Sequence, residues 1–475
     1  MQLRLDDPEL RETLDVLCRE VRDAGGRALA VGGSVRDALL GLPIVDLDLE
    51  VFGLDAEALR RVLERRFRLD LVGESFGVLK LRGLPIDVSL PRRESKQGRG
   101  HRGFAVHADP HLSFAEAATR RDFTMNAMGA DPLSGELLDP HGGRGDLEAG
   151  RLRHVSAKFA EDPLRVLRGM QMAARFRLEP TPETVALCRT IEPEGLAHER
   201  IFDEWRKLLV RGVEISRGLR FLRDTGWVRY TPELEALIHC PQDPTWHPEG
   251  DVWDHTLHVL DAFAARRLGD EREDLIVGLA CVCHDLGKPP TTRFEDGRWR
   301  SKGHEEAGEE PTRRFLGRMT DEKKLIEAVV PLVREHLKPM MLWKAKAGAA
   351  AIRRLARRVG RIDRLVRLAR ADHAGRPPLP TETPATGWLL ARAEELRLEA
   401  DAPAPLVLGR HLIELGYRPG PRFGPVLDAL FEQQLDGAFG DEAAGIDAAR
   451  VLLDGLPVDR RPARRAAVAA DRSSD

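Results

Sequence analysis

The sequence predicts an α+β fold in which a head with a mixed sheet is followed by helical domains. Four strand-like apolar runs are confined to the first part of the chain, at 28–31, 46–52, 78–81 and 85–90. From Phe159 onward the apolar residues recur at helical spacing, and strand signals are few. The chain of 475 residues is also too long for a single hydrophobic core, which predicts several domains.

The elements of the head are predicted in chain order. An amphipathic helix opens the chain and ends near Gly25, and a second helix covers 56–66 between two of the strands. Residues 91–103, PRRESKQGRGHRG, are basic and have no apolar period, so we expect a mobile loop there.

Pro-rich breaks at 240–251 and 376–387 divide the helical part of the chain. Together with the head they predict four regions: a head at 1–150, a helical neck at 151–240, a second helical domain at 241–375, and a linker with a helical extension and a frayed tail at 376–475.

The overall composition sets broad limits on function. Charged residues make up 32% of the chain and hydrophobic residues 42%, as in globular proteins, and the net charge of −3 argues neither for nor against nucleic acid. The five cysteines lack paired spacing, which fits a reduced cytoplasm. We expect a cytoplasmic protein without a membrane partner, because no signal peptide or apolar run of membrane length is visible. The oligomeric state is not predicted.

Two carboxylates, Asp46 and Asp48, stand one residue apart in a strand-like run. Side chains at i and i+2 of a strand point to the same face, so Val45, Leu47 and Leu49 are expected on the other face. Two carboxylates this close repel each other unless a cation lies between them. An all-oxygen ligand set suits Mg²⁺ that is held together with substrate phosphates.

The turn at 32–34, Gly-Gly-Ser, precedes these carboxylates and leads into a short helix with Arg36. Backbone N–H groups of such a turn and a helix N-terminus can hold a triphosphate, which predicts a nucleotidyl-transfer site. Each half has a simpler interpretation. Gly-Gly before a helix is a common loop, and Asp-x-Asp alone can be a solvated edge.

Two further aspartates have two interpretations each. Asp87 in LPIDVSL is either a third carboxylate of the site or a hydrogen-bond acceptor at a strand end. Asp122 precedes the helix-like FTMNAM and can be a simple N-cap.

Asp162 and Arg165 are three residues apart at the start of a predicted helix and share a face. They can form a simple ion pair, or they can select a base. An aspartate accepts from an exocyclic amine, and an arginine donates to a ring nitrogen, which matches cytosine and adenine. Uracil and guanine would leave buried polar groups unpaired. The pair therefore predicts selection of CTP and ATP without a template.

Three segments, GGSVRDALLGLPIVDLD, RRDFTMNA and EDPLRVLR, resemble motifs of the class II tRNA nucleotidyltransferase and bacterial poly(A) polymerase superfamily. The resemblance implies a DNA polymerase β-like head and catalytic carboxylates at Asp46 and Asp48. It further implies that Arg121 binds phosphate, Asp122 accepts from ribose hydroxyls and Asn126 orients this group. The implied nucleotide-binding residues are Gly32, Gly33, Ser34, Arg36, Arg121, Asp122, Asn126, Asp162, Arg165 and Arg168.

A second set of polar residues follows in the helical domain, in the order His, His-Asp, His, Asp. Its members are His255, His284, Asp285, His304 and Asp372. Neutral imidazoles with carboxylates suit a divalent transition metal, Ni²⁺, Co²⁺ or Mn²⁺, with an open position for water. The motif HDLGK at 284–288 resembles the HD phosphohydrolase superfamily. His336 is a less secure member, either behind the ligands or in contact with phosphate.

Head, neck and HD domain in this order resemble CCA-adding enzymes of gammaproteobacterial type, over about 29–375. The resemblance implies transfer of CMP, CMP and AMP from CTP and ATP to tRNA 3′ ends, with phosphoester hydrolysis by the HD domain. The basic loop at 92–100 favours complete CCA addition.

Two alternatives remain open. One is a partial A-adding or CC-adding enzyme or a poly(A) polymerase, and the other is an HD phosphohydrolase whose head only binds nucleotide. The basic run at 351–370 either contacts the tRNA backbone or is a solvated helix face.

Overall fold

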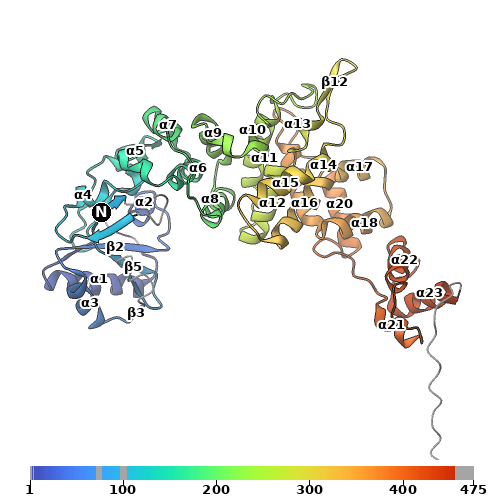
Figure 1. Cartoon of the computed structure of the whole chain (residues 1–475), viewed down its shortest axis with the longest axis horizontal. Coiled ribbons are helices and arrows are strands. Elements are labelled where there is room, and N and C mark those ends of the chain that lie inside the picture. The colour runs from blue at the N-terminus through green and yellow to red at the C-terminus, as the bar shows by residue number, and fades with distance from the viewer. Residues whose placement is uncertain (1–2, 4, 71–77, 97–103, 455–475) are drawn as a thin grey trace, which may run out of the picture.

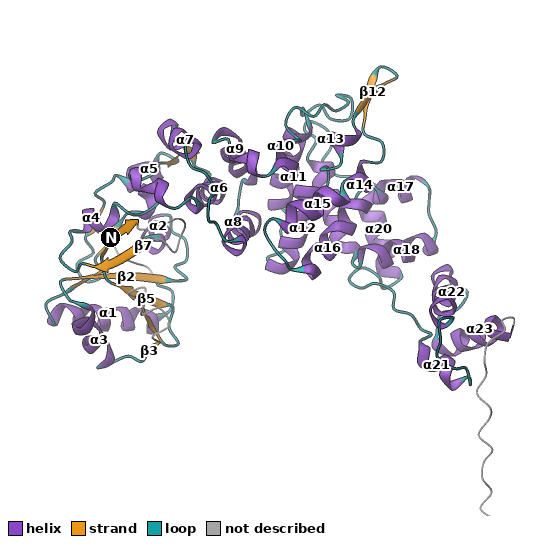
Figure 2. Ribbon diagram, viewed as in Figure 1, coloured by secondary structure: helices purple, strands orange, loops and turns teal. Residues whose placement is uncertain are grey.

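The computed structural model describes residues 3, 5–70, 78–96 and 104–454. The described chain is elongated (Figure 1). The head lies at one end, the neck and the large helical domain follow, and helices α21–α23 lie at the other end. Strands are concentrated in the head and helices in the rest of the chain (Figure 2), as the sequence predicts.

The head contains a mixed seven-stranded sheet with the order β3-β4-β5-β2-β1-β8-β9. The pair β2–β5 is parallel and the other pairs are antiparallel. Its strands are β1 (Arg27–Val31), β2 (Leu47–Phe52), β3 (Leu69–Asp70), β4 (Val78–Leu81), β5 (Ile86–Ser89), β8 (Gly129–Ala130) and β9 (Leu137–Leu138). The four runs predicted from the sequence are thus confirmed as β1, β2, β4 and β5.

Helices α1 (Pro8–Asp23) and α3 (Ala56–Glu64) pack together, and α1 packs on β1. Their starts are fixed by side chains, since Asp7 accepts from the Glu9 N–H at 2.9 Å and Asp55 accepts from the Ala58 N–H at 2.8 Å. Both predicted helices are confirmed. Their apolar faces and the sheet form the core of the head.

Two local predictions in the head need correction. Val45 is 73% exposed, because it lies before β2 begins, while Leu47 and Leu49 are buried as expected. The segment predicted as a loop is partly a hairpin, in which β6 (Arg92–Lys96) pairs antiparallel with β7 (Phe104–Ala108). The main-chain partners of β6 come from the β-prone FAVHA, which the loop prediction did not take into account. The rest of that loop, 97–103, lies outside the described residues.

The neck is built around α6 (Leu164–Phe176), which packs against α8 (His198–Arg211) and α9 (Ile215–Asp224). Its smaller elements are α7 (Pro182–Arg189), α10 (Pro232–Glu235) and the short parallel pair β10 (Arg151–Leu152) and β11 (Glu179–Pro180). The short helices α4 (Phe114–Ala118) and α5 (Gly143–Glu148) precede the neck in the chain.

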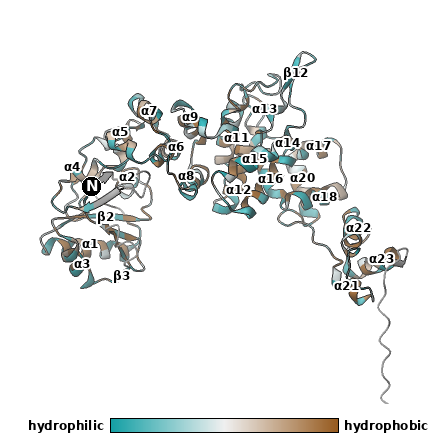
Figure 3. Ribbon diagram, viewed as in Figure 1, coloured by the Kyte–Doolittle hydropathy of each residue, from teal (hydrophilic) through white to brown (hydrophobic). Residues whose placement is uncertain are grey.

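The helical domain surrounds α12, which packs on α8, α11, α16 and α19. Its helices are α11 (Val252–Ala264), α12 (Glu271–Cys283), α13 (Lys288–Thr291), α14 (His304–Ala307), α15 (Glu309–Gly317), α16 (Lys323–Glu335), α17 (Lys338–Lys344), α18 (Ala349–Val359) and α19 (Ile362–Ala374). Apolar residues concentrate around α11 and α12 (Figure 3). A hairpin of β12 (Arg293–Glu295) and β13 (Arg298–Arg300) interrupts the helices.

One buried cluster runs from Phe123 to Leu398 through both the neck and the helical domain. The packing thus continues across the Pro-rich break at 240–251, and the domain limits given above stay predictions. Helix α20 (Pro384–Glu395) begins inside the segment predicted as a linker and packs on α17 and α19. Thr383 caps it, with its hydroxyl accepting from the Ala385 N–H at 3.4 Å.

The last three helices form a separate small core. They are α21 (Gly409–Glu414), α22 (Phe423–Asp436) and α23 (Glu442–Asp454). Arg354 of α18 forms ion pairs with Glu432 and Asp436 of α22, and Arg357 pairs with Glu432. These arginines of the basic run at 351–370 therefore face an acidic helix of the same chain. This arrangement differs from both interpretations of the run, contact with the tRNA backbone and a solvated helix face. No described helix combines the length and the apolar character needed to span a bilayer.

Candidate functional site

Three carboxylates come together in the head. Asp48 of β2 and Asp87 of β5 are direct neighbours in the parallel pair, and Asp46 immediately precedes β2. All three line one cavity of about 580 Å³. Burial of its surroundings raises the pKa of Asp48, and the charges of Asp87 and Asp46 raise it further, against the opposing charge of Arg121. The arrangement is a set of hard oxygen donors, which fits a divalent cation such as Mg²⁺.

Asp87 lies within β5 and not at its end. It also accepts from the Lys80 ammonium at 2.8 Å. Its place beside Asp48 supports the interpretation as a third carboxylate of the site, and Lys80 balances part of the local charge.

A second cavity, of about 410 Å³, lies on the other side of Asp48, which lines both. Nine of the ten residues implied as nucleotide-binding line it, and only Ser34 does not. Ser34 is buried and its hydroxyl donates to the Val31 carbonyl at 3.0 Å. The cationic residues of the lining are Arg36, Arg120, Arg121, Arg165, Arg168, Arg175, Lys207 and Arg211, against Asp48, Asp122 and Asp162. This excess of positive charge suits a triphosphate.

Asp122 is the most heavily bonded acid of the cavity. Its carboxylate accepts from the Phe123 N–H at 2.7 Å, from Asn126 Nδ2 at 3.0 Å and from Arg168 Nε at 2.8 Å. Burial alone would raise the pKa of Asp122, but the charge of Arg168 and these hydrogen bonds lower it. Asp122 is not a helix cap, because 124–126 form only a 3₁₀ turn that begins after Phe123.

The entry turn is shaped by Gly32 and Arg36. Gly32 has a φ of +72°, and a Cβ there would lie 3.0 Å from Arg121 Nη1, so a side chain is disfavoured. The Gly32 N–H donates to the Met128 carbonyl at 3.3 Å and is therefore already used. Arg36 is buried and donates to Asn126 Oδ1 at 2.7 Å, which ties the turn to the segment after Asp122.

Glu50 is fully buried and is not among the residues predicted from the sequence. It accepts from Arg120 at 2.9 Å and from Arg121 at 3.4 Å, so it holds both guanidinium groups at the cavity. Glu50 is two residues beyond Asp48 on β2, and the same alternation that pairs Asp46 with Asp48 could have found it. Of the neck residues in the lining, Arg175, Lys207 and Arg211 were also not predicted.

Asp162 and Arg165 both line the cavity. Arg165 donates to the carbonyls of Lys158 and Arg120, each at 2.7 Å, which fixes its guanidinium. Asp162 accepts from the Leu164 N–H and from Arg200, both at 3.1 Å. Both side chains are thus held in place before any ligand arrives.

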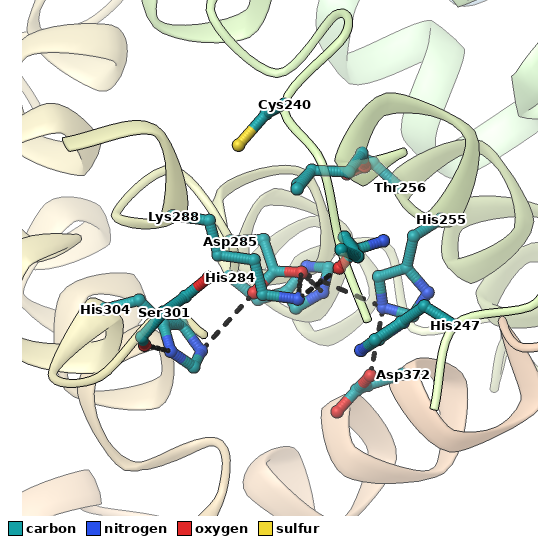
Figure 4. Close-up of polar contacts among 12 residues, drawn as sticks. Cys240, His247, His255, Thr256, His284, Asp285, Lys288, Ser301, His304 and Asp372 are labelled. Atoms are coloured by element: carbon teal, nitrogen blue, oxygen red, sulfur yellow. Dashed lines mark hydrogen bonds and ion pairs between the residues drawn. The ribbon is translucent and has the colours of Figure 1, made fainter. Parts of the chain in front are cut away.

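The second predicted set of residues also converges (Figure 4). His255 lies on α11, His284 and Asp285 follow α12, His304 begins α14 and Asp372 lies on α19. Asp285 is the centre of the set. Its Oδ2 lies 3.2 Å from His284 Nε2, and its Oδ1 lies 3.5 Å from His304 Nε2. The Nε2 of His255 lies 3.1 Å from Asp372 Oδ1.

The imidazoles are oriented by backbone carbonyls. The Nδ1 atoms of His284, His304 and His336 lie 2.6–2.8 Å from the carbonyls of Cys281, Ser301 and Val333 respectively. The Nδ1 atoms are therefore occupied, and the Nε2 atoms of His284 and His304 lie near Asp285, as in metal sites. Among the described residues, His284 Nε2 is a buried atom without a hydrogen bond, because its 3.2 Å contact with Asp285 Oδ2 does not have hydrogen-bond geometry. Such an orphaned atom in a His/Asp set fits a divalent metal.

His336 belongs to this cluster, since its Nε2 lies 3.3 Å from His304 Nε2. Two groups of ligand atoms that could each hold an ion share Asp285, one with His255 and His284 and the other with His304 and His336. Glu249 and His247, which are not among the predicted residues, lie behind His255. Glu249 is 2.8 Å from His255 Nδ1 and 2.9 Å from His247 Nδ1, a contact that sequence spacing alone cannot reveal.

Two family descriptions match separate parts of the chain. Residues 28–153 match the poly(A) polymerase head domain, and residues 252–368 match the HD domain. The first stretch contains Asp46, Asp48 and Asp122. The second contains the HD motif, while Asp372 lies just beyond it.

Curated relatives match most of the chain. A protein of Laribacter hongkongensis described as "Multifunctional CCA protein" is 39% identical over 360 residues, which cover 73% of this chain and 84% of that protein. One of the same description from Aromatoleum aromaticum is 37% identical over 398 residues, which cover 80% and 92%.

Solved structures share the fold. The Bacillus stearothermophilus CCA-adding enzyme in complex with CTP aligns with a TM-score of 0.64 over 95% of this chain and all of that chain, at 23% identity. The Thermotoga maritima CCA-adding enzyme complexed with tRNA aligns with a TM-score of 0.56 over 94% and 96%, at 18% identity. At these identities the likeness shows the architecture alone.

Proposed function

The chain belongs to the family of multifunctional CCA proteins, and on that premise we propose that it transfers CMP, CMP and AMP from CTP and ATP to tRNA 3′ ends. The observation that carries the proposal is the cationic cavity in which Asp48, Asp122 and the Asp162–Arg165 pair face one another. Such a cavity has a place for a triphosphate, a ribose and a base.

We assign substrate contacts from the hydrogen-bonding capacity of the residues. Arg121 and Arg168 bind phosphate, since both line the cavity as fixed cations. Asp122 already accepts three hydrogen bonds, and a carboxylate accepts about four, so capacity remains for a ribose hydroxyl. This contact would favour ribonucleotides.

The base is selected by Asp162 and Arg165. The carboxylate accepts from the exocyclic amine of cytosine or adenine, and the guanidinium donates to the adjacent ring nitrogen. Because both side chains are held by other protein groups, they cannot turn to suit uracil or guanine without losing those bonds. A buried mismatch of this kind carries a strong penalty.

Asp46 and Asp48, with Asp87 beside them, would hold Mg²⁺ at the head site. When bound, the metal supplies activation of the attacking 3′-hydroxyl and neutralisation of the leaving pyrophosphate. The protein residues orient the triphosphate and keep the carboxylates together.

The HD domain is proposed to hydrolyse phosphate esters, with 2′,3′-cyclic phosphates and 2′-nucleotides as candidate substrates. The ligands would be His255, His284, Asp285 and His304, with His336 as a further one. Asp372, whose Oδ1 lies 3.1 Å from His255 Nε2, would complete the set. A bound Ni²⁺, Co²⁺ or Mn²⁺ ion would supply activation of water. The Nζ of Lys288 lies 2.8 Å from Asp285 Oδ2 and lines the same cavity. Burial opposes ionisation of Asp285, but the charges of His284 and Lys288 hold the pKa of this carboxyl well below its usual range.

The test is incubation with tRNA that lacks CCA, with labelled CTP, ATP, UTP or GTP and Mg²⁺. Addition of three nucleotides in the order C, C, A supports the proposal. Addition of C alone or A alone assigns a partial enzyme, and long A tails assign a poly(A) polymerase. No incorporation, with hydrolysis of phosphate esters retained, assigns a phosphohydrolase whose head only binds nucleotide.

A further inference from the structure

The metal-ligand cluster of the HD domain opens into a cavity of about 620 Å³ that reaches the β12–β13 hairpin. Asp285, His304, His336 and Asp372 line its inner part. The outer part is lined by two tryptophans, Trp246 and Trp299, among several cationic residues. A cavity for a small inorganic phosphate needs no aromatic wall of this kind, so the tryptophans call for an explanation.

Both indoles are unusually accessible. Trp246 is 56% exposed and Trp299 is 37% exposed, whereas Trp205 and Trp253 are buried in the core. Large apolar side chains that stay exposed at a cavity commonly contact a ligand. Trp299 is held from behind by Phe294, its cross-strand neighbour, with ring centroids 5.1 Å apart.

The cavity wall also carries positive charge. Its basic residues are Lys288, Arg298, Arg300, Lys302 and Arg376. Arg300 pairs with Asp296, and Lys302 pairs with Glu295. Within the described part of the chain, Arg298 has no side-chain hydrogen bond or ion pair. Aromatic faces together with cations that are available for phosphate are typical of sites for nucleotides.

The tryptophans are connected to the ligand cluster by short stretches of chain. Trp246 precedes His247, whose ring centroid lies 4.8 Å from that of His255. The base of the hairpin is closed by the Thr292 and Ser301 hydroxyls, 2.8 Å apart, and the Ser301 carbonyl accepts from His304 Nδ1 at 2.8 Å. The backbone that carries each tryptophan is therefore tied closely to the residues that would bind the scissile phosphate.

We infer that Trp246 and Trp299 form a stacking surface for a nucleobase, so that the HD centre takes phosphate esters of nucleosides in preference to esters of simple alcohols. The inference rests on the proposed hydrolase function. In the reaction, the oxygen of water bonds to phosphorus and the bond from phosphorus to the ribose oxygen breaks. One proton of the water passes to the leaving ribose oxygen. Trp246 and Trp299 act by holding the base and take no part in bond breaking.

The test compares hydrolysis of adenosine 2′-monophosphate and of glycerol 2-phosphate by the full chain with Ni²⁺. For Trp299→Ala and Trp246→Ala we expect KM for the nucleotide to rise roughly tenfold, the loss typical of one stacked base, with kcat within about twofold. KM for glycerol 2-phosphate should not change. Trp299→Phe should restore most of the nucleotide KM, because a phenyl ring also stacks.

A matched control is Trp343→Ala, which removes a tryptophan of α17 that does not line this cavity. It should leave both KM values unchanged. Equal KM changes for the two esters in the cavity variants, or none at all, would overturn the inference. So would a rise in KM for tRNA during CTP incorporation without any change in nucleotide hydrolysis.

The nucleoside can be free or the last unit of an RNA chain. A short oligonucleotide that ends in a 2′-phosphate distinguishes these sources. If its KM rises in the variants along with that of the free nucleotide, the surface also takes an RNA end, and if its KM stays unchanged, the surface takes the free nucleotide. If the parent hydrolyses neither ester with any metal, the proposed hydrolase function fails. Calorimetric titration with adenosine 2′-monophosphate then tests the stacking surface without hydrolysis. Any binding of this nucleotide to the head is the same in the parent and the variants, so a difference in Kd reports on the tryptophans. A roughly tenfold weaker Kd in the variants supports the surface, and an equal Kd overturns it.

Discussion

Replacement of Asp48 by Asn should abolish nucleotide transfer while leaving the fold intact. Asp48 is the residue at which the basic cavity and the carboxylate cavity meet. The change removes one of the carboxylates beside Asp46 and Asp87 with almost no change in shape. A metal that neutralises charge in the transition state contributes several kcal/mol, so we expect transfer to fall by about a thousandfold or more, roughly 4 kcal/mol.

The same change should not destabilise the protein. The pKa of Asp48 is raised in the folded state, first because the surrounding protein displaces part of the water around the carboxyl, and then by the charges of Asp87 and Asp46, against the opposing charge of Arg121. Because this pKa is higher in the folded than in the unfolded protein, protonated Asp48 favours the folded state. That contribution is fully present below the unfolded pKa and is lost as pH rises through the folded pKa. At pH 7, ionised Asp48 therefore opposes folding. Because solvent reaches the Asp48 side chain, the Asp48→Asn change should raise the free energy of unfolding by at most about 1 kcal/mol. This increase should vanish below about pH 4, where the parent carboxyl is protonated.

The assay measures CTP incorporation into tRNA lacking CCA, thermal unfolding between pH 4 and 7, and glycerol 2-phosphate hydrolysis on the same preparations. Hydrolysis should be unaffected, because the HD residues belong to another cavity. Asp23→Asn at the end of α1 is the control for loss of one exposed carboxylate, and it should keep the parent transfer rate. Transfer by Asp48→Asn within tenfold of the parent, or a loss of stability at pH 7, would refute the reasoning.

Three further predictions address the other residues. Asp162→Ala and Arg165→Ala should each slow CTP incorporation and admit UTP or GTP, because the contact that distinguishes an amine from a carbonyl is lost; continued exclusion of both nucleotides at the parent level would show that bases are selected elsewhere. The double change His284→Ala with Asp285→Ala should remove phosphoester hydrolysis in Ni²⁺, Co²⁺ and Mn²⁺ and leave Mg²⁺-dependent CTP incorporation within about twofold. If the double variant lost CTP incorporation while circular dichroism showed that it was folded, the two sites would not be independent. Glu50→Gln should lower the free energy of unfolding by about 1–3 kcal/mol, because the buried partner of two arginines loses its charge. Chemical denaturation measures this, and an unchanged midpoint would mean that other groups hold the arginines.

Local patterns determined much of the fold and of both candidate sites. The strands β1, β2, β4 and β5 were predictable because each alternates or clusters apolar residues over a few positions. Asp46 and Asp48 were predictable as a pair because their spacing is itself a local geometry. The HD motif was predictable for the same reason, since His284 and Asp285 are adjacent in the chain.

Other features depend on partners far away in the sequence. The strand β6 was taken for a loop because its pairing partner, β7, supplies the order that its own polar sequence lacks. The basic run at 351–370 allowed two interpretations because nothing local says that Arg354 faces Glu432 and Asp436 of α22. Helix α20 was partly hidden in a Pro-rich stretch, because proline is compatible with a helix start and a linker alike.

The sequence by itself thus determined which chemical groups are available: paired carboxylates, a cationic set, and a His/Asp cluster. Only the tertiary structure decided which of them meet. It placed Asp87 beside Asp48, put Glu50 behind Arg121, brought His336 to His304 and set Trp246 and Trp299 on one cavity. The physical reason is that strand register and helix packing fix these neighbours across long sequence separations, whereas composition and spacing describe only what lies within a turn or a strand.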